Sequence, residues 1–150
     1  MEMRPVRFGD VEVEPLLVGL TYEYDTRYGE NMEMTRTTES EFDPPSGLFI
    51  VFMDGPVTAA GGGFRRHDAK TCEVKRMWTS PDYRRRGLAG RVLGALEDGA
   101  WAAGYSRVVL ETGPRQPEAE ALYTRRGYSR IEFYGHYPDA RAFSLDLPAR

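Results

Sequence analysis

Hydrophobic runs along the chain predict its strands. Residues 47–53 read Gly-Leu-Phe-Ile-Val-Phe-Met, an unbroken apolar run typical of a buried strand, and Asp54-Gly55 predicts a hairpin turn into a second strand over 57–64. A polar turn at 67–70 then leads to a third strand over 71–79, so an antiparallel meander of three strands is expected. Further strands are predicted over residues 5–8, 107–112, 128–134 and 142–147.

Apolar residues at helical spacing predict the helices. Between residues 88 and 103 they recur every three or four positions, and Gly104 follows as the expected end of this helix. A second helix is predicted over 117–126. Residues 11–28 also show helical spacing, which Pro15 is expected to interrupt.

The order of these elements defines the fold class. The helix over 88–103 joins the strand over 71–79 to the strand over 107–112, and a crossover of this kind makes the two strands parallel. We therefore predict an α/β protein (α+β in some schemes) with a mixed, largely antiparallel sheet, a central parallel βαβ unit and helices on both faces. A length of 150 residues makes a single domain, residues 1–150, the expectation.

Composition and charge narrow the class of function. Hydrophobic residues make up 41% of the chain, which predicts a folded, compact protein. The net charge of -3 argues against general binding to nucleic acid, whose phosphates select a basic surface. The first ten residues are charged and carry no long apolar run, so neither a signal peptide nor a membrane span is predicted, and the expected location is the cytoplasm.

Cysteine and histidine offer little catalytic or metal chemistry. The single cysteine, Cys72, excludes an intramolecular disulfide, and it lies in an apolar strand pattern where a buried, unreactive thiol is expected. The two histidines, His67 and His136, have no partner at the spacing of metal ligands. The sequence therefore predicts no metal site.

The residues with the clearest chemistry form a basic glycine loop between the strand over 71–79 and the helix that follows it. The loop reads Arg84-Arg85-Arg86-Gly87-Leu88-Ala89-Gly90. Glycine lets the backbone approach a ligand closely, and the unpaired N–H groups that open a helix attract anions. Neither Walker A nor dinucleotide-binding spacing is met. The loop therefore predicts a site for a phosphate-bearing cofactor.

Two segments resemble the signatures of a known family. The stretch Glu73-Val-Lys-Arg-Met-Trp-Thr-Ser-Pro-Asp-Tyr-Arg84-Arg-Arg-Gly87-Leu-Ala89 is similar to the core motif of the GNAT superfamily of acyl-CoA N-acyltransferases, whose loop reads Gln or Arg, two residues, Gly, one residue, Gly or Ala. Ala121-Leu-Tyr123-Thr-Arg-Arg-Gly127-Tyr128 is similar to the family's second signature. The resemblance extends over residues 71–134, and it implies a GNAT-like fold and an N-acetyltransferase that uses acetyl-CoA as its acyl donor.

The resemblance also implies which residues contact the cofactor. Main-chain donors of the loop, aided by its arginines, would hold the pyrophosphate of acetyl-CoA. In the family a bulge splays this strand from its parallel neighbour, so that the pantetheine arm pairs with its backbone, and the opposite parities of Val74 and Met77 fit such a bulge. Where many members carry an asparagine, this chain has Arg115 and Gln116. The implied cofactor-binding residues are Met77, Trp78, Thr79, Arg84, Arg85, Arg86, Gly87, Leu88, Ala89, Gly90 and Gln116.

Acylation of an amine needs a proton for the departing thiolate and a base for the attacking amine. The resemblance implies that Tyr123 is the acid, although a tyrosine at this helical spacing also suits the core. It implies that Glu73 is the base. The structural alternative is a pairing of Glu73 with Lys75, with Arg76 or with a neighbouring strand, and the catalytic alternative is Glu111 or a water relay. No serine–histidine–aspartate arrangement is visible, so direct attack without an acyl-enzyme is expected.

The acceptor is expected to be the primary amine of a small molecule, bound together with acetyl-CoA. The acidic segment over 30–41 would attract a cation, and His136 with Tyr134 and Tyr137 would line a pocket for it. A protein or peptide amine is the alternative substrate, and an acyl-CoA-binding regulatory module without turnover is the alternative class. Neither nucleic acid nor a membrane is expected as a partner, and a homodimer through sheet edges or exposed apolar patches would fit a domain of this size.

Overall fold

A computed structural model of the chain describes residues 1–28, 39–113, 116–132, 134–135 and 139–149. The strands are β1 (Glu2–Val6), β2 (Leu48–Asp54), β3 (Val57–Arg66), β4 (Thr71–Thr79), β5 (Arg107–Thr112), β6 (Ser129–Ile131) and β7 (Arg141–Asp146). The α-helices are α1 (Glu14–Tyr28), α2 (Leu88–Ala102) and α3 (Pro117–Arg125), and the short 3-10 helices are η1 (Val11–Val13), η3 (Glu39–Phe42) and η4 (Pro81–Tyr83).

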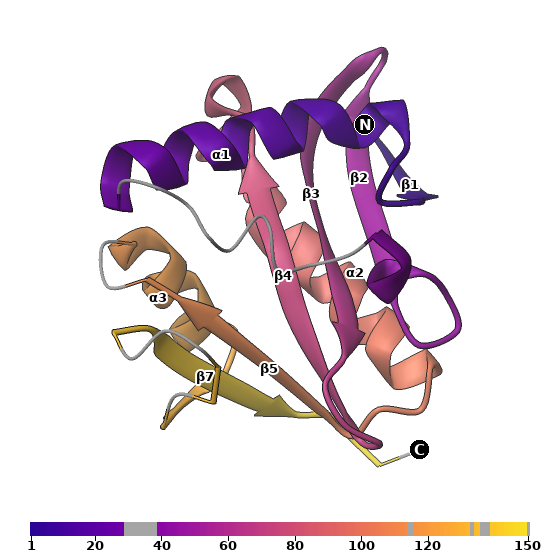
Figure 1. Cartoon of the computed structure of the whole chain (residues 1–150), viewed down its shortest axis with the longest axis vertical. Coiled ribbons are helices and arrows are strands. Elements are labelled where there is room, and N and C mark those ends of the chain that lie inside the picture. Colours follow the sequence, from indigo (N-terminus) through magenta and orange to yellow (C-terminus); the bar gives the residue numbers. More distant parts are fainter. Residues whose placement is uncertain (29–38, 114–115, 133, 136–138, 150) are drawn as a thin grey trace.

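The strands form one seven-stranded sheet in the order β1-β2-β3-β4-β5-β7-β6 (Figure 1). Strands β1 to β4 make an antiparallel meander, β4 pairs with β5 in parallel, and β7 lies antiparallel between β5 and β6. Helix α2 provides the crossover between β4 and β5. The predicted fold class, a mixed and largely antiparallel sheet with one central parallel βαβ unit, is confirmed.

Three elements differ most from the prediction, and β3 also extends to Arg66, two residues beyond its predicted end. The first strand is Glu2–Val6 rather than 5–8, because its register is set by pairing with β2 and its own residues are mostly exposed. Pro15 does not interrupt the first helix, since α1 begins at Glu14 and the proline lies in the first turn, where no intrahelical donor is needed. The strand predicted over 128–134 is shorter, and its pairing with β7 is confined to Ser129–Ile131.

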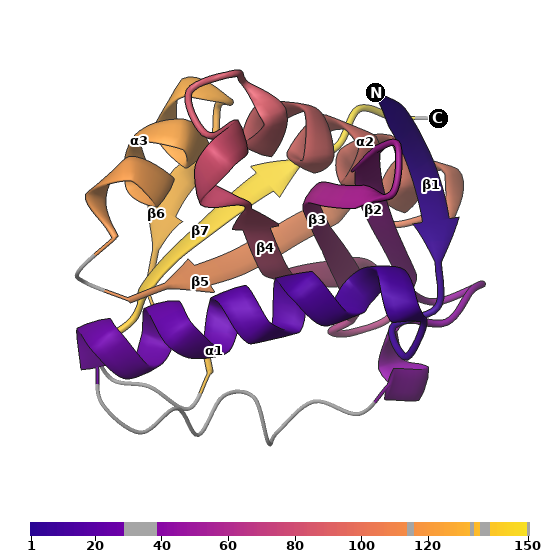
Figure 2. The same ribbon diagram turned by 90° about the horizontal axis from the view of Figure 1, so that it is seen from above.

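Helices cover both faces of the sheet (Figure 2). Helices α2 and α3 pack on one face, where Val92, Leu93 and Leu96 of α2 are fully buried. Helix α1 and η3 pack on the other face. We call the first the α2 face and the second the α1 face. The α1 face holds a smaller core of Phe8, Val13, Leu16, Leu20, Phe42, Phe49, Val51, Met53 and Trp78.

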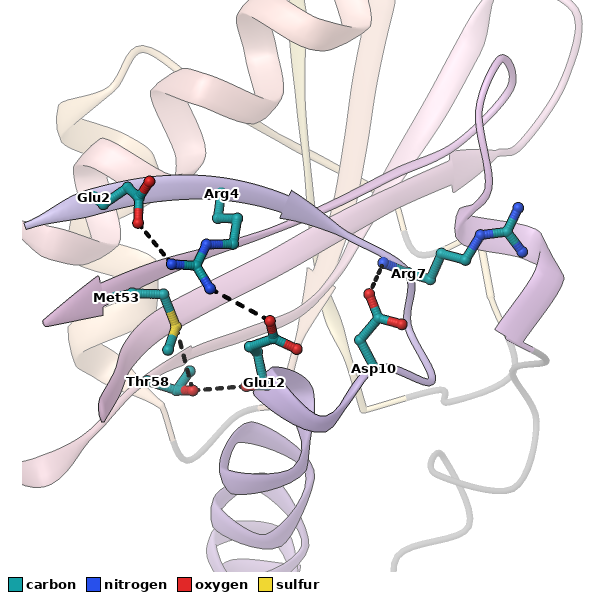
Figure 3. Close-up of polar contacts among 7 residues, drawn as sticks. All are labelled: Glu2, Arg4, Arg7, Asp10, Glu12, Met53 and Thr58. Carbon is teal, nitrogen blue, oxygen red and sulfur yellow. Dashed lines mark hydrogen bonds and ion pairs between the residues drawn. The ribbon is translucent and has the colours of Figure 1, made fainter. Parts of the chain in front are cut away.

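The start of α1 is attached to the β2–β3 hairpin through polar contacts (Figure 3). The hydroxyl group of Thr58 donates to the main-chain oxygen of Glu12, which lies in η1, at 2.7 Å. The side chain of Glu12 in turn accepts from Arg4 of β1 at 3.4 Å, and Arg4 also bonds Glu2 at 2.7 Å. These contacts join the edge strand, η1 and the hairpin, and so they fix where α1 begins.

The middle of α1 rests directly on β4, and Gly19 allows this close approach. A Cβ atom at residue 19 would lie 2.6 Å from Cε2 and 2.8 Å from Cζ2 of Trp78, well inside van der Waals contact. We expect Gly19→Ala to lower the free energy of unfolding by about 1–3 kcal/mol, because the helix or the indole must move. Urea denaturation would measure it, with Val18→Ala as the control at a neighbouring, 71% exposed position. Equal effects of the two variants would contradict the packing described.

Candidate active site

Strands β4 and β5 separate soon after they pair. Their parallel register covers only Thr71, Cys72 and Glu73 opposite Arg107, Val108 and Val109, and β4 has no further β5 partner within the described strands (Figure 1). We call the end of this pairing, at Glu73 and Val109, the divergence point. Beyond it, one side of the β4 backbone is available to pair with a ligand instead of a strand.

A bulge in β4 lies just past the divergence point. It was predicted because Val74 and Met77 would face opposite sides of a regular strand. The pairing register with β3 shifts between Gly61 and Gly63, and Arg76 has a φ of 62°. An extra residue of this kind bends the strand and increases its twist. The bulge therefore gives a physical reason for the separation of β4 from β5.

The residues predicted to pair with pantetheine, Met77, Trp78 and Thr79, form the end of β4 beyond the bulge. Trp78 turns its indole toward the α1 face, where it lies against Gly19, whereas Met77 packs against the core of the α2 face. The main-chain oxygen of Thr79 accepts a hydrogen bond from Nε of Arg84 at 3.1 Å.

The glycine loop joins η4 to α2 and presents a helix N-terminus. Tyr83 holds η4 in place, because its hydroxyl group donates to Oδ2 of Asp54 at 2.6 Å. Gly87 is the N-cap of α2 with a φ of 75°, and Arg85 has a φ of 64°. Successive N–H groups in turns with left-handed residues form anion-binding concavities, and the first N–H groups of the helix add to them.

The space around the loop fits a phosphate-bearing group. A Cβ atom at Gly87 would meet nothing within 4 Å, and one at Gly90 would meet only Leu122 of α3, at 3.8 Å. The main chain at both positions is therefore approachable from outside. The donors at this helix start, together with the open surface above them, fit the diphosphate of coenzyme A.

Within the described residues, Arg84 and Arg86 of the loop each have an intramolecular partner. Arg84 pairs through Nη2 with Glu23 of α1, and the guanidinium group of Arg86 lies 5.1 Å from the ring centre of Tyr83. The side chains of Arg84 and Arg86 are therefore less available for the phosphate contacts that were expected of them. The main-chain donors after Tyr83 are the stronger candidates for anion binding.

Tyr123 lies on the α2 face, level with the divergence point along the strands. It is 6% exposed, and its ring centre is 5.5 Å from that of Phe143 and 5.9 Å from that of Tyr128. Phe143 in β7 is paired with Leu110, which is the residue of β5 that follows the divergence point. The ring thus belongs to the core, as the packing alternative proposed, and its helix lies beside the start of α2 through Leu122 and Gly90.

Glu73 lies at the divergence point itself and is held by partners on the α1 face. It is 5% exposed, its Oε1 accepts from Nε of Arg65 at 3.0 Å, and its Oε2 accepts from the hydroxyl group of Tyr134 at 2.8 Å. Burial, together with the negative charge of Glu73, raises the pKa of Tyr134, so Tyr134 stays protonated and remains a donor. Each carboxylate oxygen of Glu73 can still accept another hydrogen bond.

Arg65 connects this carboxylate to η3. Its Nη1 lies 2.9 Å from Oε2 of Glu41, so one guanidinium group joins two acidic side chains from different elements. Glu41 belongs to the acidic segment that was expected to attract a cation, and the structure shows it paired within the protein. The residues of that segment from 30 to 38, like His136 and Tyr137, lie outside the described residues.

Glu111, the alternative base, lies on β5 beyond the divergence point. A Cβ atom at Gly135 would lie 3.0 Å from the carboxyl carbon of Glu111, so the carboxyl group is packed against the main chain at residue 135. The charge of Glu111 also contributes to the raised pKa of Tyr134. Glu73, Glu111 and Tyr134 are therefore neighbours at one place on the sheet. Gln116, the remaining predicted cofactor contact, is the N-cap of α3.

A neighbouring strand was among the expected sources of a partner for Glu73, but Arg65 itself was not named. The predicted turn at 67–70 pairs residues whose numbers add to 137, which places Glu73 opposite Phe64, whereas the observed connection spans residues 67–71 and the paired numbers add to 138. The observed register pairs Arg65 with Glu73 and Phe64 with Val74. Two facing residues of opposite charge on neighbouring strands are expected to form an ion pair.

Cys72 is fully buried, as predicted, and burial raises its pKa to about 12. We expect its thiol to resist an aromatic disulfide reagent in the native protein at pH 8, because almost no thiolate is present and the sulfur is inaccessible. In denaturant one thiol should react at once, which serves as the control. Rapid labelling of the native protein would contradict this assignment.

Neither a metal-ligand group nor a membrane-spanning helix is found among the described residues. In the part of the chain that the structure describes, no three His, Cys, Asp or Glu side chains come together as a metal-ligand group. Within the same ranges, each helix is too short or too polar to span a bilayer.

Comparison with known proteins identifies the family. The family model described as "Acetyltransferase (GNAT) family" matches residues 16–128. An IAA acetyltransferase of Azospirillum brasilense is 39% identical over 106 residues, which are 70% of this chain and 69% of the relative. The chain therefore belongs to the GNAT family, and it is an acyl-CoA-dependent N-acyltransferase.

Solved structures agree on the fold. An acetyltransferase of the GNAT family from Staphylococcus aureus superposes with a TM-score of 0.82 at 14% identity, covering 98% of this chain and 100% of that one. An acetyltransferase from Salmonella typhimurium, solved with acetyl-CoA, superposes with a TM-score of 0.69 at 14% identity, covering 100% of this chain and 96% of that one. Together with the family match, this likeness confirms the predicted resemblance, and the family match confirms the prediction of an enzyme.

Proposed function

We propose that this protein transfers the acetyl group of acetyl-CoA to the primary amine of a small molecule, and that the amine attacks the thioester directly within a ternary complex. The observation that carries the proposal is the divergence of β4 from β5 at Glu73. Tyr123 is buried on the α2 face at this level, whereas Glu73 is bonded to residues of the α1 face. An acid and a base on opposite faces of the gap between β4 and β5 suit an acetyl transfer that takes place between them.

The cofactor contacts follow from the main chain. In this proposal the N–H groups of residues 85–90 bind the diphosphate, and the backbone of Met77, Trp78 and Thr79 bonds the amides of the pantetheine arm. Gln116 takes the place of the asparagine found in many relatives. The open surface at Gly87 and Gly90 supports the first contact, and the lack of a β5 partner beyond Glu73 supports the second within the described strands.

Tyr123 would supply the proton for the departing thiol. As the C–N bond forms and the C–S bond breaks, the sulfur carries the electron pair away, and the phenol hydroxyl group can protonate it. The ring contacts with Tyr128 and Phe143 support this role, because they leave the side chain little freedom to turn.

Glu73 would take the proton that the amine loses. Its two oxygens already accept from Arg65 and Tyr134, and these bonds orient the carboxylate with lone pairs to spare. Glu111 is close enough to the same place to serve instead, and a water relay is the third route. In each case the acceptor approaches from the α1 face.

We further propose that residues 1–150 act as one catalytic domain. The support is that a single sheet uses residues from Glu2 to Asp146 and that the family model matches residues 16–128.

A substrate screen tests the proposed reaction. The purified protein would be incubated with acetyl-CoA and a panel of small primary amines, with release of coenzyme A followed by a thiol reagent and products identified by mass. Peptides with free N-termini and with lysine form the second arm. Turnover on small amines is the expected result, whereas turnover on peptides alone would overturn the small-molecule assignment.

A further inference from the structure

Arg84 connects three elements that meet beside the cofactor loop. Its Nε donates to the main-chain oxygen of Thr79, at the end of β4, at 3.1 Å. Its Nη2 forms an ion pair with Oε1 of Glu23, on α1. The Arg84 side chain is 43% exposed and that of Glu23 is 27% exposed, so the pair is partly shielded from water. One guanidinium group therefore ties the loop both to the strand before it and to a helix from the other end of the sequence.

Helix α1 is well suited to act as the fixed side of this contact. Thr58 holds its start through the main-chain oxygen of Glu12, and Gly19 lets its middle rest on Trp78. The helix crosses β3 and β4 (Figure 1). Glu23 follows one turn after Gly19, so the carboxylate projects from a helix that already has two points of attachment.

We propose that Glu23 is a positioning residue for acyl-CoA binding, which acts through Arg84 to hold the loop over residues 84–90 in register with the end of β4. The inference rests on the proposed placement of the diphosphate in this loop. Thr79, at one end of the contact, belongs to the segment assigned to pantetheine, and Gly87, at the other, opens the helix assigned to the diphosphate. Correct spacing between these two parts lets a single ligand bind both.

The charges of the loop show why a carboxylate is useful there. Arg84, Arg85 and Arg86 are consecutive, so their guanidinium groups repel one another and also compete for an incoming anion. Glu23 neutralises Arg84 and keeps its side chain at Thr79, while Arg86 stacks on Tyr83. The main-chain N–H groups are then the anion donors, and they are held in place before the ligand arrives.

Loss of the carboxylate tests the proposal directly. We expect Glu23→Ala to raise the Kd for coenzyme A, measured by calorimetry, and the KM for acetyl-CoA by about three- to tenfold, with kcat at saturation changed less than about twofold. Glu14→Ala is the matched control, since it removes the same side chain from the exposed start of the same helix. Its affinity for coenzyme A should equal that of the parent.

A double-mutant cycle separates a role through Arg84 from a general structural one. Arg84→Gln should weaken coenzyme A binding, and adding Glu23→Ala to it should cause no further loss, because the carboxylate has lost its partner. Additive losses, or unchanged or tighter binding by Glu23→Ala alone, would overturn the inference. Glu23→Asp, which keeps the charge on a shorter side chain, should fall between the parent and Glu23→Ala. Failure of the parent itself to bind coenzyme A would overturn the proposed placement of the diphosphate instead.

Discussion

Replacement of Tyr123 by phenylalanine is expected to lower kcat by about a hundredfold to a thousandfold, the usual contribution of a positioned general acid. The coenzyme A thiolate is a modest leaving group at neutral pH, so its departure benefits from a proton delivered as the C–S bond breaks. The Kd for coenzyme A should change little, since the loop and the end of β4 are untouched. Steady-state kinetics on the acceptor found in the substrate screen, with calorimetry for coenzyme A, would measure both quantities.

The substitution should leave the fold intact. The ring of Tyr123 packs against Tyr128 and Phe143, and phenylalanine keeps that packing. A loss of activity without a matching fall in melting temperature therefore points to chemistry rather than to unfolding.

Tyr128→Phe provides the matched control. This neighbouring tyrosine is 5% exposed, and its hydroxyl group donates to Oε2 of Glu97 at 3.0 Å. The control therefore also removes a phenol hydroxyl group, but one whose hydrogen bond is structural. It should cost about 1–3 kcal/mol of stability and leave kcat within about twofold of the parent. If Tyr123→Phe behaves like Tyr128→Phe, Tyr123 is a core residue and not the acid.

The parts of the fold that depend on local pattern could be predicted from the sequence. The apolar run of β2, its Asp54-Gly55 turn and the stripe of α2 each contain their own signal, and the conflict of parity between Val74 and Met77 revealed the bulge. The parallel pairing of β4 with β5 followed from the helix between them. These features together define the divergence point.

The edges of the fold were harder to predict, because partners rather than propensity decide them. Strand β1 is an exposed edge whose position is fixed by its register with β2, and the extent of β6 is fixed by β7. Helical spacing alone does not locate the first turn of α1, and for this reason it predicts an interruption at Pro15, a position where the first turn tolerates proline.

Side-chain networks that join distant segments were the least predictable. Glu73 could be named from the motif, but its bond with Tyr134 joins residues far apart in the chain, and Arg84 with Glu23 does the same. The Arg65–Glu73 pair is the shortest in range of these three, but it depends on a connection of five residues, 67–71, rather than on the predicted turn at 67–70. Candidate residues thus came from local motifs, whereas their charge partners came from the packing of strands and helices.

Neutralising Glu73 is expected to have the second large effect. Glu73→Gln removes the charge that faces Arg65 and Tyr134 and places an amide among groups that are already donors. We expect a loss of about 2–4 kcal/mol in stability, because one member of a largely buried ion pair is removed. We also expect kcat/KM to fall by about a hundredfold if Glu73 takes the proton of the amine.

Glu41→Gln is the matched control, because Glu41 bonds the same guanidinium group from its outer side. The Glu41 side chain is 38% exposed, whereas that of Glu73 is 7% exposed, so loss of this charge should cost less than about 1 kcal/mol. Its kcat/KM should stay near that of the parent, since Glu73 keeps Arg65 and Tyr134.

The pH dependence of kcat/KM decides what Glu73 does. A base that must be ionised produces a fall in kcat/KM on the acid side, and removing that base removes this limb of the profile. If Glu73 only orients its surroundings, Glu73→Gln should be slower at every pH with the acid limb retained, and Glu111→Gln should be the variant that abolishes it. Retention of the limb in both variants would assign the proton to water, with the acidic pair on the α1 face orienting the amine.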